Sequence, residues 1–127
     1  MNDVLAGSCL CGAVGFELLS LPKAVAHCHC RQCQKGHGAA FASYGSVPRS
    51  DLRLLRGLES LTGYASSPGV LRQFCAACGA SLFWSRSAGE HADWVSVALS
   101  ALDDAFVPGK QQHIYVESRA PWCGVGL

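Results

Sequence analysis

Short runs of alternating hydrophobic and polar residues dominate this chain. The run GAVGFELL places Val14, Phe16 and Leu18 on one face of a strand, since successive strand side chains point to opposite faces. In QHIYVESR, the same alternation puts His113 and Tyr115 on one face. Further strand-length runs are separated by the turn-forming stretches PRSD, SSPG, SAGE and PGKQ; they are AAFASYGSV, LRLLRG, SLTGYAS, GVLRQFC, SLFWSR and DWVSVAL. The pattern predicts a mainly β fold.

Helical signals are few. Only CRQCQKGHG (residues 30–38) and LSALDDAFV (residues 99–107) have room for a turn or two of helix. No internal repeat or low-complexity tract interrupts the chain. Its 127 residues, half of them hydrophobic, suffice for one core and are too few for two comfortable ones. We therefore expect a single domain, residues 1–127, built of small antiparallel sheets with little helix.

Charge and hydropathy narrow the classes of partner. Ten Lys plus Arg against nine Asp plus Glu give a net charge of +1, which supplies no broad electrostatic footprint for nucleic acid or an anionic membrane. The start, MNDVLAGSCL, has neither the basic nor the apolar region of a signal peptide, and no segment approaches the roughly 18 apolar residues of a membrane span. We expect a cytoplasmic protein that binds a small molecule or a protein surface.

Eight cysteines stand out against this ordinary composition, at positions 9, 11, 28, 30, 33, 75, 78 and 123. In a reducing cytosol, clustered cysteines are more often metal ligands or catalytic thiols than disulfides. The short C-x-C and C-x-x-C spacings favour metal further. The sequence therefore predicts metal binding.

Two of the cysteine groups are pairs. Cys9 and Cys11 lie at the entrance of the first strand, where residues two apart face the same side. Cys75 and Cys78 form a C-x-x-C knuckle followed by Gly79, which permits a left-handed backbone. Together the pairs make four ligands, the closed tetrahedral set of a structural zinc. Spacing alone would equally allow Cys9 and Cys11 to share an ion with Cys28 and Cys30.

The third group is the stretch CHCRQC, which holds Cys28, Cys30 and Cys33. If the two pairs satisfy one another, these three thiols lack a fourth ligand, and an open coordination position is typical of a catalytic zinc. The alternative is a closed second site, completed by a nearby histidine or the last cysteine; the candidates are His27, His29, His37 and Cys123. His29 is the awkward candidate, because on an extended Cys-His-Cys segment it points away from both neighbouring thiols.

Each charged or histidine residue in or beside this stretch has two possible roles. Arg31 and Lys35 can offset an anionic metal site or bind substrate carboxylates, or they can be solvated loop charges. His29 and His37 can move a proton near neutral pH, or they can be structural.

Four motifs, GSCLCGAVGFE, HCHCRQCQKGHGAAF, FCAACGASLFW and HIYVESRAPW, together resemble the glutathione-dependent formaldehyde-activating enzyme family, over residues 7 to 122. The resemblance implies a zinc-bound β-tent with two zinc ions. It assigns the structural zinc to Cys9, Cys11, Cys75 and Cys78, and a catalytic zinc to Cys28, Cys30 and Cys33.

The activity implied by the resemblance is carbon–sulfur lyase chemistry, in which glutathione adds to formaldehyde or is released from the adduct. Three thiolates on Zn²⁺ leave a soft site with a net charge of −1, and a fourth thiol is a natural ligand for such a site. A free thiol has a pKa of about 8.5, and coordination to the ion lowers that pKa. Two other classes stay open. A zinc-stabilised binding module predicts a closed second site and an exposed patch, whereas a redox or metal-handling protein predicts accessible thiols that release metal on oxidation.

Overall fold

The structure is a computed structural model that describes residues 4–124. It is mainly β, as the alternation predicts, with one α-helix and four short 3₁₀ turns in the described range. The strands are β1 Leu5–Ser8, β2 Gly15–Leu18, β3 Lys23–Cys28, β4 Ala42–Pro48, β5 Leu52–Arg56, β6 Leu61–Ser67, β7 Val70–Cys75, β8 Ser81–Arg86, β9 Trp94–Ala98 and β10 Gln111–Ile114. The helix is α1 Arg31–His37, and the 3₁₀ turns are η1 Arg49–Asp51, η2 Leu58–Ser60, η3 Leu99–Ala101 and η4 Val116–Ser118.

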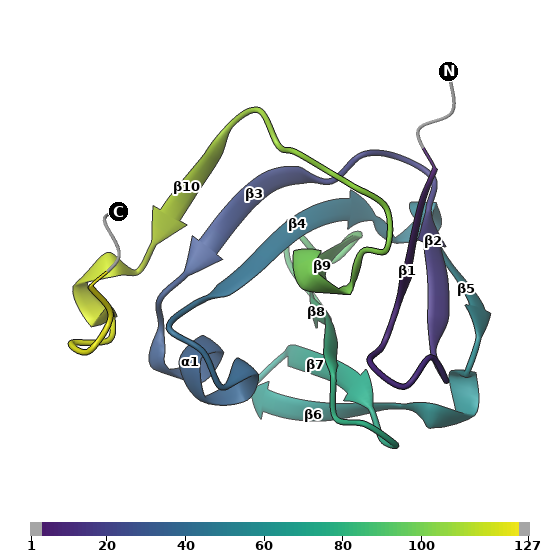
Figure 1. Ribbon diagram of the computed structural model, residues 1–127, viewed down its shortest axis with the longest axis horizontal. Coiled ribbons are helices and arrows are strands. Elements are labelled where there is room, and N and C mark those ends of the chain that lie inside the picture. The colour runs from purple at the N-terminus through teal and green to yellow at the C-terminus, as the bar shows by residue number, and fades with distance from the viewer. Residues whose placement is uncertain (1–3, 125–127) are drawn as a thin grey trace.

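The strands form two sheets of unequal size. β1, β2 and β5 make a three-stranded antiparallel sheet, and the other seven strands follow the order β10-β3-β4-β9-β8-β7-β6. Every pairing in the large sheet is antiparallel except β10 with β3, which is parallel. Figure 1 shows the small sheet beside one end of the large one, and α1 in the connection between β3 and β4.

The core lies between the two sheets. Val14, Phe16 and Leu18 are fully buried, as their alternation predicts. The Phe16 ring meets Phe83 of the large sheet edge to face, with centroids 5.1 Å apart. Gly7 leaves room for this ring, because a Cβ atom at that position would lie 2.2 Å from it. Aromatic packing across the sheets therefore depends on a small residue in β1.

Several local expectations differ from the structure. Residues 30–38 do contain a helix, but in 99–107 only Leu99–Ala101 coils. Tyr115 has a φ of 57°, a left-handed conformation that ends β10, so it does not continue the strand face of His113. The strands β1 and β3 were not predicted, since neither shows a regular alternation. β3 also carries a bulge between Lys23 and Ala26.

No helix within residues 4–124 combines the length and the hydropathy that crossing a membrane requires.

Candidate metal centre and adjoining cavity

The structure gathers seven of the eight cysteines into two clusters. In the first cluster, the sulfur atoms of Cys9, Cys11, Cys75 and Cys78 all lie within 4.8 Å of one another. This is the grouping that the family resemblance implied and that spacing left undecided. It joins the β1–β2 connection to the turn between β7 and β8, two segments more than 60 residues apart in the chain.

Local backbone geometry brings each pair together. Cys75 and Cys78 form the predicted knuckle, in which the Gly79 N–H donates to the Cys75 carbonyl at 2.7 Å and Gly79 has a φ of 79°. The first pair is held differently from the prediction. Cys9 and Cys11 lie in the turn after β1 rather than on a strand, and the Gly12 N–H donates to the Cys9 carbonyl at 3.2 Å.

The sulfur spacing of this cluster fits a tetrahedral ion. Cys9 and Cys11 have their sulfurs 3.7 Å apart, and those of Cys11 and Cys75 are 3.9 Å apart. Zinc–sulfur bonds of about 2.3 Å in a tetrahedron separate the sulfurs by roughly 3.8 Å. A disulfide needs about 2.05 Å, and all eight cysteines are unbridged. The four thiols therefore have the donor type, number and spacing of a closed zinc site.

The second cluster consists of Cys28, Cys30 and Cys33, whose sulfurs also lie within 4.8 Å of one another. Cys28 ends β3, Cys30 is the N-cap of α1, and Cys33 sits in its first turn. The Cys33 N–H donates to the Cys30 sulfur at 3.4 Å. A strand end followed at once by a short helix thus points three thiols at one position, and three soft ligands suit zinc.

None of the four candidate fourth ligands joins this cluster within residues 4–124. His29 is completely buried on the other side of the segment, where its Nε2 lies 2.8 Å from Nδ1 of His113. The His27 ring lies between Ser43 and Gln111. Its Nδ1 is 2.8 Å from Ser43 Oγ, and its Nε2 is 2.6 Å from Gln111 Oε1. Cys123 lines a separate surface hollow near the end of the chain.

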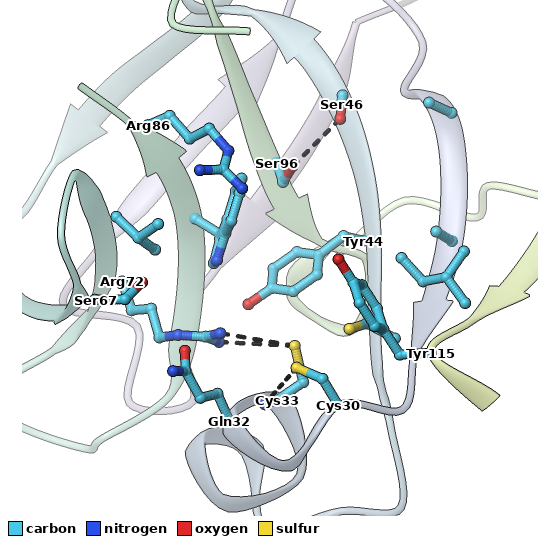
Figure 2. Close-up of a pocket in the computed structure, with 16 residues that line it drawn as sticks. Cys30, Gln32, Cys33, Tyr44, Ser46, Ser67, Arg72, Arg86, Ser96 and Tyr115 are labelled. Atoms are coloured by element: carbon cyan, nitrogen blue, oxygen red, sulfur yellow. Dashed lines mark hydrogen bonds between the residues drawn. The ribbon is translucent and has the colours of Figure 1, made fainter. Parts of the chain in front are cut away.

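A cavity of about 390 Å³ opens beside the three thiols. Its walls come from β3, β4, β6, β7, β8 and β9, from α1 and from the segment at β10, and Figure 2 shows the side chains that line it. The lining residues are Ala24, Ala26, Cys28, Cys30, Gln32, Cys33, Tyr44, Ser46, Ser67, Val70, Arg72, Trp84, Arg86, Ser96, Ile114 and Tyr115. A half-open, largely apolar cavity with a few convergent polar groups is typical of a small-molecule site.

Arg72 connects the opposite wall to the cysteines. Its Nε donates to the Ser66 hydroxyl oxygen at 3.0 Å. Both terminal nitrogens of its guanidinium group lie 3.8 Å from the Cys33 sulfur (Figure 2). A fixed positive charge at this distance favours the thiolate form of the cluster. Arg72 comes from β7, 39 residues after Cys33.

Tyr44 and His37 form a hydrogen-bonded pair at the edge of the cavity. Tyr44 Oη and His37 Nε2 are 2.6 Å apart. Burial raises the pKa of Tyr44 well above its usual value, and the nearby thiol of Cys33 raises it further. Burial and the charge of Arg72 lower the pKa of His37. At neutral pH, a neutral phenol therefore lies against a neutral imidazole.

Burial acts against the charged form of the cluster itself. It raises the pKa of Cys33 to about 12, and it raises the pKa of Cys28 as well. Without a cation, the thiols of Cys28 and Cys33 hold their protons at neutral pH. The pKa of Cys30 is instead lowered despite burial, because the Cys33 N–H donates to its sulfur. A bound divalent ion would supply the charge that deprotonates Cys28 and Cys33, so the donor set and its surroundings agree with a metal site.

Arg31 and Lys35, predicted as substrate-binding residues, lie on the exposed surface of α1 and do not line the cavity. Arg31 instead contacts the side chain of Gln34 at 2.5 Å. Their roles stay predictions. The cation that does face the thiols, Arg72, was missed, although an arginine within the strand-like run GVLRQFC was a signal that could have drawn attention to it.

Comparisons with known proteins find similarity over most of the chain. The sequence profile of the family described as "Glutathione-dependent formaldehyde-activating enzyme" matches residues 4–118. A Halomonas elongata protein named "Putative glutathione-dependent formaldehyde-activating enzyme" is 31% identical over 132 residues, covering 94% of this chain and 79% of that protein. A Schizosaccharomyces pombe protein named as an uncharacterized lyase is 25% identical over 93 residues, covering 73% and 66%. The crystal structure of a Rhodobacter sphaeroides protein superposes with a TM-score of 0.68 at 29% identity, covering 86% of this chain and 99% of that one.

Proposed function

The chain belongs to the glutathione-dependent formaldehyde-activating enzyme family, and on that premise we propose that it is a zinc-dependent carbon–sulfur lyase. It joins a thiol such as glutathione to a small aldehyde such as formaldehyde, and it reverses that reaction. One observation carries the proposal: three thiols converge at the wall of a cavity, and no fourth His, Cys, Asp or Glu of residues 4–124 completes their set. A structural zinc site would need that fourth protein ligand.

In the addition, the thiol loses its proton, sulfur forms a bond to the carbonyl carbon, and the carbonyl oxygen gains a proton. The reverse reaction removes the proton from the hydroxyl oxygen, breaks the carbon–sulfur bond as the carbonyl double bond re-forms, and returns a proton to sulfur. Zinc held by Cys28, Cys30 and Cys33 would supply the charge that lowers the pKa of a thiol beside it. The first cluster, far from the cavity lining, would hold a purely structural ion.

Arg72 provides the charge balance for this chemistry. Its two terminal nitrogens face Cys33, so it offsets the negative charge that three thiolates concentrate at the cavity wall. Its hydrogen bond to Ser66 holds the guanidinium group in place. An anionic thiolate substrate can then approach a site that would otherwise repel it.

Tyr44 and His37 are suited to handle the proton at oxygen. As the carbonyl oxygen takes negative charge, the neutral Tyr44 hydroxyl gives it a proton, and a hydrogen bond from the Nε2–H of His37 stabilises the phenolate that remains. This hydrogen bond requires the tautomer in which Nε2 carries the proton. Because the low pKa of His37 keeps the imidazole neutral, solvent supplies the proton that restores the Tyr44 hydroxyl.

Replacing Tyr44 by phenylalanine is expected to lower kcat for adduct formation by about 100-fold, the usual scale for loss of one general acid. Zinc content and the melting temperature should change little, because the ring stays in place. Tyr64→Phe is the matched control, since Tyr64 is exposed on β6 and does not line this cavity. Equal kcat values for Tyr44→Phe and wild type would remove Tyr44 from the proton path.

The proposed function is tested by counting zinc and then adding glutathione. We expect two tightly bound equivalents per chain. In protein whose zinc is replaced by cobalt, glutathione should change the thiolate-to-metal absorption of one site only. Steady-state measurement with glutathione and formaldehyde should show formation of the adduct above the uncatalysed rate.

Two results would contradict the proposal. A single equivalent of zinc that ignores glutathione would favour a zinc-stabilised binding module instead. Release of zinc on mild oxidation, without any adduct formation, would favour a redox or metal-handling role.

A further inference from the structure

We propose that the cavity selects thiols carrying a carboxylate a few bonds from the sulfur and lacking an ammonium group, with Arg86 as the specificity-determining residue. This inference rests on the proposed function, because it takes the sulfur of the substrate to lie at the three-cysteine cluster. It concerns the far end of the same cavity, which no step of the proposed chemistry uses.

The register of the β7–β8 pair brings Arg86 into the cavity. Arg72 lies opposite Trp84, and Val70 lies opposite Arg86. Because strand residues two apart share a face, all four side chains line one wall. Arg72 and Trp84 form one cross-strand row, and Arg86 lies in the next row on the same face. The two rows are two residues apart, or roughly 7 Å along the strand. Figure 2 shows it on the same side as Arg72 and further from the cysteines.

The guanidinium group of Arg86 is oriented but not neutralised. Its central carbon lies over the Trp84 ring, 5.1 Å from the centroid, a cation–π arrangement that favours this position of the group. The ion pairs within residues 4–124 are Arg53 with Glu17 and the exposed pair of His91 with Glu90. Neither involves Arg86, so its planar set of donors is available to a ligand carboxylate.

Apart from the thiols, the charged side chains of the cavity lining are all cationic. Among residues 4–124 they are Arg72 and Arg86, and no Asp or Glu of this range lines the cavity. The remaining polar groups include the hydroxyls of Ser46 and Ser96, which lie 3.3 Å apart on the neighbouring strands. A ligand ammonium group at the far end would meet a guanidinium group and find no carboxylate.

Length also limits the ligand. The step of roughly 7 Å along the strand from the Arg72 row to Arg86 suits a short spacer between sulfur and carboxylate. A tripeptide such as glutathione brings carboxylates but also an ammonium group, which this lining does not match. The geometry therefore favours small mercaptocarboxylates over glutathione at this site.

The test compares three thiols of similar length by isothermal titration calorimetry on the zinc-loaded protein: 3-mercaptopropionate, 2-mercaptoethanol and cysteamine. The thiols end in a carboxylate, a hydroxyl and an ammonium group, respectively. We expect affinity to fall in that order, with at least a tenfold difference between the first and the last. Glutathione, measured in parallel, should bind more weakly than 3-mercaptopropionate.

Variants at Arg86 assign the preference to this residue. Arg86→Gln should weaken 3-mercaptopropionate binding by about tenfold, the scale of one charge-assisted hydrogen bond, and leave 2-mercaptoethanol unchanged. Arg86→Glu should reverse the order of 3-mercaptopropionate and cysteamine. Arg53→Gln is the matched control, since Arg53 is exposed on β5 in the other sheet and should alter none of the affinities.

Equal affinities for the three thiols, or an unchanged preference in Arg86→Gln, would overturn the inference. The proposed function would survive that outcome if adduct formation with formaldehyde is still observed. A charge preference that depends on Arg86, without adduct formation, would instead support the binding site and contradict the proposed function. The two failures are thus separable.

Discussion

Replacing Cys75 by serine is expected to remove one zinc equivalent and to unfold the protein at 37 °C. Cys75 is completely buried, and its sulfur lies 3.9 Å from that of Cys11. The first cluster joins the turn after β1 to the end of β7, so loss of its ion removes one of the links between the small sheet and the large one. Structural zinc contributes on the order of 10 kcal/mol in small domains, comparable to the whole free energy of unfolding.

Zinc content by mass spectrometry and the melting transition by circular dichroism check this expectation. Cys123→Ser is the matched control, because Cys123 is half-buried, unbridged and outside both clusters. It should keep both zinc ions and the wild-type melting temperature. If Cys75→Ser retained two equivalents and melted like wild type, the first cluster would not be a structural metal site.

Replacing Cys30 by serine is expected to abolish turnover and to release the other zinc equivalent while leaving the fold nearly intact. Cys30 lies at the cavity wall and is partly exposed, so little of the core depends on it. As the N-cap of α1, it accepts a hydrogen bond from the Cys33 N–H. Serine is itself a preferred N-cap residue, so the helix should survive the change that removes the ligand.

The measurements are zinc content, kcat for adduct formation and the melting temperature of the same preparation. A fall of more than 100-fold in kcat with a melting temperature within a few degrees of wild type is the expected result. A large fall in the melting temperature would show that the second cluster is a second structural metal site. Full activity in Cys30→Ser would exclude the three thiols from the reaction.

Much of the fold could be predicted from local patterns. The alternation of Val14, Phe16 and Leu18 indicated a buried strand face, and all three are fully buried. Alternation depends only on neighbouring residues and the two-residue period of a strand, so it can be recognised in the sequence without knowledge of the fold. It misled at Tyr115, because a left-handed residue breaks the period and nothing in the letters QHIYV marks it.

The sequence by itself determined the local cysteine groups, because pairs and triplets close in the chain meet through one turn or one strand end. The tertiary structure decided which pairs share a cluster and what faces the three remaining thiols. Arg72 and Arg86 reach the cavity through the pairing of β7 with β8, and Tyr44 through the pairing of β3 with β4. Strand register between distant segments sets these contacts, and register depends on packing of the whole core rather than on local sequence. Spacing could therefore locate the thiols, but only the fold brought Arg72 and Tyr44 to them.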